Sequence, residues 1–251
     1  ENKTKKSIDQ NLLKDSKISE GKKLNSKVIK KNIKKSNKNI LLYRVQFGSF
    51  RDLNKAKLAK KNIEIKYATN GTTLGIKGGR TVHEYWPKFK SVAVNVSIDG
   101  LHDTYEYIRG NGKFADVEYN IKEMKKIPSV SRIVGAFTVQ ANNILQIDKV
   151  IDYFLRDMEI VFYSHRVNYP RALSAQVLPE KLNQAVVVKL EAMKDKVKDY
   201  PIIQKHPVLE KITLRQIQDN INFLQAKDLH QYWDDCVDFN RKLDETRNQG
   251  P

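Results

Sequence analysis

The chain of 251 residues contains one cysteine, Cys236. One cysteine excludes an intrachain disulfide framework, and it excludes a thiolate metal cage built by this chain alone, because such cages need three or four thiolates. No run of about 18 apolar residues occurs, so we expect no transmembrane helix. Glu1 is not an initiator methionine and no apolar signal core follows it. We therefore expect a fragment or a processed product.

Aromatic residues and proline are absent from residues 1–39, which are rich in Lys, Asn and Ser. This composition predicts a disordered basic linker. Residues 1–62 hold 19 Lys or Arg against 5 Asp or Glu, whereas residues 63–251 hold 27 against 24. A basic arm can bind nucleic acid, but this one lacks interleaved aromatics that stack on bases. We expect a solvated linker, with nucleic-acid binding as an alternative.

Strand and helix patterns alternate regularly from residue 63 onward. Strands are predicted over 63–68, 92–98, 132–140 and 159–165, and helices over 114–127, 143–155, 178–197 and most of 208–248. Residues 81–89 predict a short helix or irregular turn, limited by Pro87. Strands joined by helical crossovers predict parallel βαβ units, and hence an α/β fold built as a doubly wound sheet or a partial barrel.

The strand predicted over 92–98 has two unlike faces. Its apolar face holds Val92, Val94, Val96 and Ile98, and its small, polar face holds Ala93, Asn95, Ser97 and, beyond the strand, Asp99. A parallel strand buried in an ordinary sheet is apolar on both faces. One polar face therefore predicts a strand that lines a wet cavity, as in a barrel that holds a ligand.

Polar residues also follow the neighbouring strands. Asn70 and Gly71 end one strand, Ser97 and Asp99 end the next, and Gln140 to Asn143 end a third. The carboxyl ends of parallel strands are where α/β proteins bind ligands. Each position also has a plainer interpretation, as a turn at 70–71 and 99–100 or as a helix cap at Asn143.

Three segments carry a family resemblance: TNGTTL at 69–74, VAVNVSIDGLHDTYEYIRGNGKFADVEYNIKEMKKI at 92–127 and GAFTVQANNILQIDKVIDYFL at 135–155. Together they resemble a twitch-type radical S-adenosylmethionine (SAM) protein of the kind found in phages, over about residues 63–251. The resemblance implies a partial (β/α) barrel of parallel strands, truncated at its N-terminal side. It implies SAM as cofactor and, in the family, a [4Fe–4S] cluster.

The resemblance also implies roles for single residues. Ser97 and Asp99 would contact the ribose and adduct of the cofactor, and Gln140 and Asn142 would add contacts from the next strand. Arg109 would hold the cofactor or its loop; the alternative is a salt bridge to Asp103 or Glu106. With Asn70, these residues form the candidate cofactor site: Asn70, Ser97, Asp99, Arg109, Gln140 and Asn142.

The sequence departs from the family at the cluster. The CxxxCxxC motif that binds the cluster is absent, as is the Gly-Gly-Glu segment that follows the second strand in the family. Without three thiolates the chain has no ligand set for a [4Fe–4S] cluster. We therefore expect a fragment of a radical SAM enzyme that retains part of the cofactor pocket and is not catalytic alone.

The segment YRVQFGSFRDLNKAKLAKK at 43–61 is similar to the first strand and helix of a SPOR domain, a peptidoglycan-binding module. This resemblance implies glycan contacts at Gln46 and Ser49 and a place in the cell envelope, whereas the radical SAM resemblance implies the cytoplasm. The predicted organisation is a linker over 1–39, a truncated SPOR-like unit over 40–62, a partial barrel over 63–207 and a helical extension over 208–251. A junction between two sequences is expected near 61–63.

Overall fold

The computed structural model describes residues 63–76, 79–110 and 112–248. The chain divides into two units, Glu1–Leu41 and Leu42–Pro251, and every described residue belongs to the second. The linker predicted over 1–39 and the SPOR-like unit predicted over 40–62 lie outside the described residues. The same holds for the candidate glycan contacts Gln46 and Ser49.

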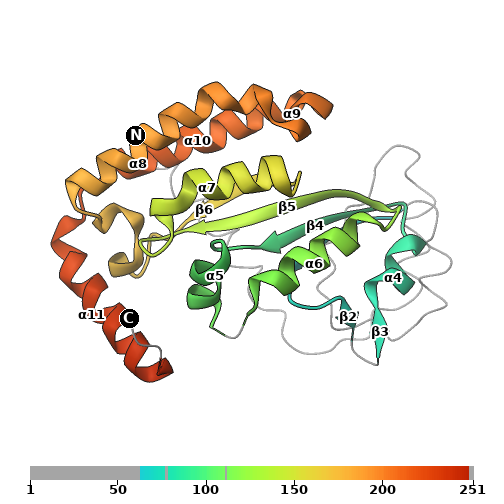
Figure 1. The fold of residues 1–251 in the computed structure, drawn as a ribbon, viewed down its shortest axis with the longest axis horizontal. Coiled ribbons are helices and arrows are strands. Elements are labelled where there is room, and N and C mark those ends of the chain that lie inside the picture. Colours follow the sequence, from blue (N-terminus) through green and yellow to red (C-terminus); the bar gives the residue numbers. More distant parts are fainter. Residues whose placement is uncertain (1–62, 77–78, 111, 249–251) are drawn as a thin grey trace, which may run out of the picture. The chain divides into compact units, whose positions relative to one another are not determined.

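Four parallel strands form the central sheet (Figure 1). They are β1 (Glu64–Thr69), β4 (Ser91–Ser97), β5 (Val130–Val139) and β6 (Val161–Arg166). Their order across the sheet is β1-β4-β5-β6, so each strand lies beside the next one along the chain. The predicted α/β class with a parallel sheet is confirmed.

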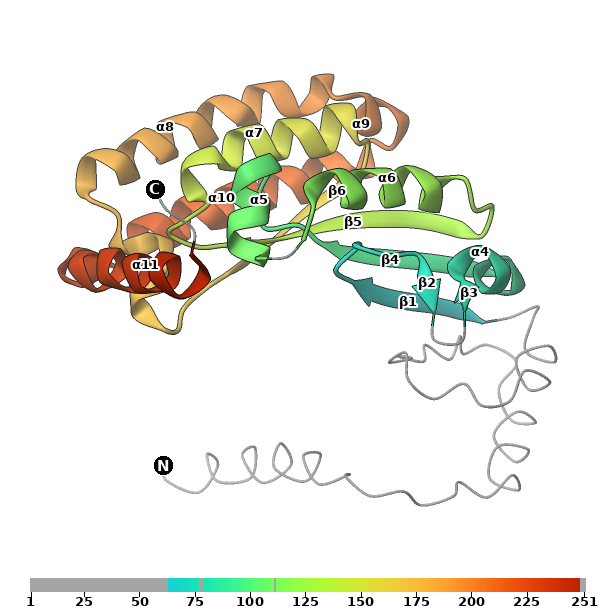
Figure 2. The same cartoon turned by 60° about the horizontal axis from the view of Figure 1, so that its bottom comes forward.

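The connections between the strands are mainly helical. Between β1 and β4 the chain forms a small antiparallel pair, β2 (Gly75–Ile76) and β3 (Arg80–Thr81), and then α4 (Val82–Tyr85). α5 (His102–Arg109) and α6 (Phe114–Lys125) connect β4 to β5, and α7 (Ile147–Asp152), continued by a π-helical turn at Tyr153–Asp157, connects β5 to β6. Figure 2 shows α6 and α7 on the same face of the sheet.

The chain after β6 is helical, as predicted. α8 (Glu180–Lys196) packs on α7, and α10 (Val208–Ala226) contacts both α8 and β6. α9 (Pro201–Lys205) lies between α8 and α10 in the chain. α11 (Trp233–Arg247) is the last helix of the described residues. None of the described helices has the length and apolar character needed to cross a membrane.

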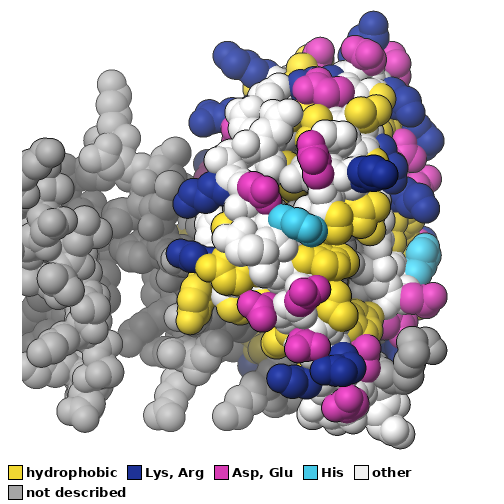
Figure 3. Space-filling view, turned by 90° about the vertical axis from the view of Figure 1, so that its left-hand side faces the viewer, with side chains coloured by type: hydrophobic (Ala, Val, Ile, Leu, Met, Phe, Trp, Pro, Cys, Tyr) yellow, Lys and Arg dark blue, Asp and Glu magenta, His cyan; other side chains and the backbone are white. Residues whose placement is uncertain are grey.

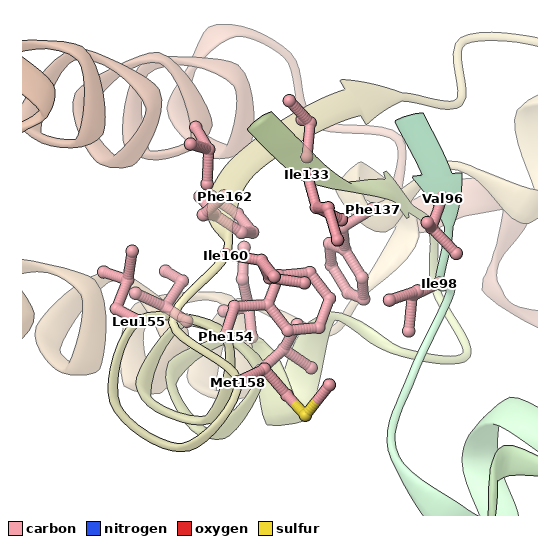
Figure 4. Close-up of a cluster of buried hydrophobic side chains, with 14 of the residues drawn as sticks. Val96, Ile98, Ile133, Phe137, Phe154, Leu155, Met158, Ile160 and Phe162 are labelled. Carbon is pink, nitrogen blue, oxygen red and sulfur yellow. The ribbon is translucent and has the colours of Figure 1, made fainter. Parts of the chain in front are cut away.

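The hydrophobic core lies between the sheet and the helices that cover one of its faces, α6 and α7 among them (Figure 4). The predicted apolar helix faces are buried there: Val117, Ile121 and Met124 on α6, and Ile144, Ile147, Ile151, Phe154 and Leu155 around α7. Gly135 on β5 is a point of very close approach, because a Cβ at this position would lie 2.3 Å from the Phe154 ring. The absence of a side chain at Gly135 therefore lets the π-helical turn pack directly onto the strand.

The opposite face of the sheet has a different character, and in Figure 2 no described helix packs against it. Its side chains are mostly exposed or half-buried, and they are small, polar or charged: Lys66, Ala68, Ala93, Asn95, Ser97, Arg132, Ala136, Thr138, Tyr163 and His165. Two buried residues, Val134 and Val161, pair with each other on this face. We call it the open face. The prediction of one apolar and one polar face for β4 is confirmed.

Candidate functional site

The predicted site residues lie at the edge of the sheet where the carboxyl ends of the strands meet. Thr69 pairs with Val96 and Ser97 pairs with Ala136, so the ends of β1, β4 and β5 are neighbours. Asn70 directly follows β1, and Gln140 directly follows β5. The structure therefore gathers these predicted residues at one edge.

Asp99 and Arg109 form an ion pair just beyond β4. Arg109 Nη2 lies 2.5 Å from Asp99 Oδ2, and the Asp99 side chain is 8% exposed. The other oxygen, Asp99 Oδ1, accepts a hydrogen bond of 2.9 Å from the backbone N–H of Thr138 on β5. Arg109 thus does not take the predicted alternative partners Asp103 or Glu106. Both Asp99 oxygens serve to join the end of β4 to α5 and β5.

Asn143 ties the same two strand ends together. Its Nδ2 donates to the backbone oxygens of Asp99 (2.9 Å) and Thr138 (2.8 Å), and its Oδ1 accepts from the backbone N–H of Gln140 at 2.9 Å. Asn143 holds the N-cap position of a short 3₁₀ turn, Ile144–Gln146, as predicted, but its side chain makes no capping bond. Its role is therefore a buried bridge between the loops that follow β4 and β5.

Asn70 has the contacts of a turn residue. Its Oδ1 accepts from the backbone N–H of Thr72 (3.2 Å) and from the Thr72 hydroxyl (3.0 Å). Gly71 has a φ of 75°, and a Cβ there would lie 2.6 Å from Val96. These contacts match the plainer interpretation of Asn70 and Gly71 as a turn, while the amide nitrogen of Asn70 makes no hydrogen bond with a described residue.

Ser97 and Gln140 have side chains that are available to a ligand. Both residues are half-buried, and neither side chain hydrogen-bonds to any residue in the described part of the chain. Ser97 lies on the open face, in register with Ala136, and Gln140 lies just beyond Thr138 on the neighbouring strand. One hydroxyl and one amide therefore stand at the carboxyl end of the open face with free hydrogen-bonding capacity.

Asn142 contacts a residue that the sequence did not point to, Asn240 of α11. The two amides bond reciprocally: Asn142 Nδ2 donates to Asn240 Oδ1 at 2.8 Å, and Asn240 Nδ2 donates to Asn142 Oδ1 at 3.1 Å. Asn240 Oδ1 also accepts from the Tyr107 hydroxyl at 3.2 Å. This pair anchors α11 to the loop after β5 and to α5.

Two cavities share the Asn142–Asn240 pair. One has a volume of about 590 Å³ and lies along α11, with Trp233, Arg241 and Asp244 in its wall. The other, of about 390 Å³, is lined by Asp103, Thr104, Tyr107, Asn142 and Asn240. Both fall within the size range of small-molecule sites. Figure 3 faces the left-hand end of Figure 1, where α11 lies, and shows hydrophobic side chains among acidic and basic ones.

The second cavity has a tyrosine that stays protonated to high pH. Burial raises the pKa of Tyr107 to about 12, and the carboxylate of Asp244 beside the hydroxyl adds to the shift. Tyr107 therefore acts as a hydrogen-bond donor over the physiological range. Sequence reasoning missed Tyr107, Asn240 and Asp244, because α11 lies more than a hundred residues from α5 in the chain.

The side chains present do not fit an iron–sulfur cluster. No group of three His, Cys, Asp or Glu side chains with the arrangement of metal ligands occurs among the described residues. Cys236 is buried, burial raises the pKa of its thiol, and Asn240 Nδ2 donates to its backbone oxygen at 2.9 Å. One buried thiol cannot replace three thiolates.

No protein-family model matches the chain, and no curated protein matches it. The assignment of a function therefore depends on the geometry of this edge of the sheet and on the motifs of the sequence.

Proposed function

We propose that residues 63–248 are part of the cofactor-binding sheet of a radical SAM protein, and that the carboxyl end of the open face takes the nucleoside part of S-adenosylmethionine. The observation that carries the proposal is the contrast between the two faces of β4. Helices bury one face, and the other is small, polar and uncovered by described helices. A partial barrel, with the open face as its interior, would give a parallel sheet this asymmetry.

Neutral hydrogen-bonding groups would make the contacts with the nucleoside. The Ser97 hydroxyl and the Gln140 amide can each donate and accept, as ribose hydroxyls and ring nitrogens require. Asn142 and the free amide nitrogen of Asn70 would add contacts on either side. Ala136, in register with Ser97, places only a small side chain at this end of the open face.

Asp99 and Arg109 would act on the ligand through the loops. Their charges compensate each other, and Asp99 also accepts from the Thr138 backbone. We assign them to positioning Ser97 and Gln140 rather than to direct contact with ribose. This role differs from the one that the family resemblance implies for Asp99.

Catalysis is not part of the proposal. In the radical SAM family, a [4Fe–4S] cluster supplies the electron that cleaves the bound cofactor. The chain has one thiol where the cluster needs three, so we assign no step that passes through a cluster. The proposed activity of this chain is binding of the cofactor.

Calorimetric titration of the full chain with S-adenosylmethionine tests the proposal, with adenosine as a competitor. We expect saturable binding that Ser97→Ala and Gln140→Ala each weaken about fivefold, since one net hydrogen bond contributes about 1 kcal/mol. Tyr119→Ala, at an exposed position of α6, is the matched control and should bind as the parent does. Absence of saturation at millimolar ligand, or equal binding by all variants, would overturn the proposal.

A further inference from the structure

The two edges of the sheet differ in what the described residues place against them, and a described helix closes the β6 edge. The outward backbone N–H of Ser164 on β6 donates to Gln216 Oε1 of α10 at 2.9 Å, and the Ser164 hydroxyl donates to the same oxygen at 3.0 Å. Asn220 Nδ2, one turn further along α10, donates to Ser164 Oγ at 2.9 Å. A helix therefore occupies the position that a further strand would need.

Within residues 63–76, 79–110 and 112–248, no helix or strand covers the outer edge of β1 in this way. β1 pairs with β4 on its inner side, and no other strand in the described part of the chain pairs with it. Lys66 and Ala68 are exposed. The unpaired N–H and C=O groups of an edge strand form a template for another strand.

The sequence that leads into β1 has the pattern of a strand followed by a helix. Tyr43, Val45 and Phe47 alternate with polar residues, Gly48 and Ser49 follow, and residues 51–61 have helical spacing up to the start of β1. These residues lie outside the described part, so the pattern is one of sequence alone. Residues 48–63 are long enough for the crossover between two parallel strands, which takes a dozen residues or more.

Handedness selects the edge on which such a strand lies. The crossovers from β4 to β5 and from β5 to β6 place their helices on one face while the chain advances across the sheet in one direction. Crossovers between parallel strands are right-handed almost without exception. A strand before β1, with its helix on that same face, must therefore lie on the outer side of β1. If the helix that precedes β1 lay on the open face instead, a right-handed crossover would place the added strand beside β6. There Gln216 of α10 already closes the edge.

We propose that residues 42–47 pair in parallel with the outer edge of β1 as a fifth strand of this sheet. Tyr43, Val45 and Phe47 would then share the helix-covered face with Ile65 and Tyr67. Arg44 and Gln46 would share the open face with Lys66 and Ala68. The proposal rests on the sheet edges and on handedness, and it does not depend on the proposed cofactor. It is an alternative to the SPOR interpretation of residues 43–61.

Paired cysteines in the full chain test this arrangement. In a Cys236→Ala background, Arg44→Cys is combined with Lys66→Cys, and Gln46→Cys with Ala68→Cys. Registers shifted by two residues in either direction are tested by combining Arg44→Cys with Ala68→Cys and Gln46→Cys with Lys66→Cys. We expect a disulfide to form in one of these registers, because adjacent strands bring the two Cα atoms within disulfide distance. The control combines Arg44→Cys with Lys122→Cys on the exposed side of α6. Cross-linking no greater than in this control would overturn the proposal.

Hydrogen exchange provides a second test in a chain that keeps Cys236. Val45→Pro removes a backbone donor and blocks strand pairing, so the outward amides of β1 should exchange faster than in the parent. Asn32→Pro is the control and should leave their exchange unchanged. If Val45→Pro leaves the exchange of the β1 amides unchanged, the proposal is overturned. In that case a pull-down with peptidoglycan sacculi decides the role of the segment. Capture of the full chain that is lost in Gln46→Ala would assign the segment to glycan binding.

Discussion

Arg109 of α5 forms an ion pair with Asp99, just beyond the end of β4, with a nitrogen–oxygen distance of 2.5 Å. The second oxygen of Asp99 accepts from the Thr138 backbone of β5, and Asn143 bonds to the backbone oxygens of both Asp99 and Thr138. These contacts fix the loops after β4 and β5 relative to each other. They therefore hold Ser97, the last residue of β4, and Gln140, directly after β5, in fixed relative positions. We assign both residues to the cofactor.

Replacing Asp99 by Asn should destabilise the fold strongly. The amide keeps an oxygen for the Thr138 N–H, but Arg109, whose side chain is 30% exposed, loses its counter-ion. Because the pair is partly buried, we expect a loss of about 2 kcal/mol, between the values for exposed and for fully buried pairs. Denaturant unfolding measures the loss. Asp238→Asn, which removes an exposed partner of Arg241, is the control and should cost less than about 1 kcal/mol. Equal losses for the two variants would mean that the Asp99–Arg109 pair does not organise this edge.

Gly135→Ala should destabilise the chain by overpacking. The added methyl group would lie 2.3 Å from the Phe154 ring, and inserting a methyl group into a packed core costs about 1–3 kcal/mol. Phe154→Leu removes the ring edge, so the double variant should be more stable than the sum of the single changes predicts. Thermal or denaturant unfolding of the three variants gives the coupling. Simple additivity would show that the close contact is not what restricts position 135.

Gln216→Ala should weaken the β6 edge. It leaves the Ser164 N–H without an acceptor at a buried position, which costs about 1–3 kcal/mol. The amide of Ser164 should also exchange faster with solvent. Gln218→Ala, two residues further along α10, removes side-chain contacts to Asn222 and Lys194 and should leave the Ser164 amide unchanged. Protection of Ser164 that survives in Gln216→Ala would show that α10 does not close this edge.

Tyr107 should make stability fall at alkaline pH. The folded chain holds its phenolic proton up to about pH 12, whereas the unfolded chain releases it near pH 10. The stabilisation is therefore complete below about pH 10 and is lost as the pH rises through about 12. Tyr107→Phe should remove this part of the decline, and Tyr119→Phe should not. Parallel pH profiles for the parent and Tyr107→Phe would contradict the shift.

The hydrophobic periodicity of the sequence was sufficient to predict the four strands and most helices. Each predicted strand overlaps an observed one, because alternation on β4 and helical spacing on α6 and α7 reflect burial against one core. The helix α5 was missed. It is short, Gly100 and Gly110 flank it, and its N-cap residue Leu101 offers no capping side chain, so the usual start signals are absent.

The positions of the candidate site residues were predictable only where these residues directly follow the strands. Ser97, Asp99 and Gln140 lie at or just after the ends of predicted strands. Because parallel strands end at one edge of a sheet, their proximity could be predicted from the sequence. The partners of these residues were not predictable: Arg109 pairs with Asp99 rather than with its sequence neighbours, and Asn142 pairs with Asn240 of α11. Such contacts depend on how distant helices pack, which local periodicity does not encode.

Amide chemical-shift mapping of the isotope-labelled full chain, titrated with S-adenosylmethionine, shows directly whether the carboxyl edge of the sheet binds the cofactor. We expect saturable shifts concentrated at Ser97, Gln140 and Asn142, with little change on α6 at Tyr119. Shifts absent at millimolar cofactor, or confined to residues away from the carboxyl edge of the sheet, would contradict it.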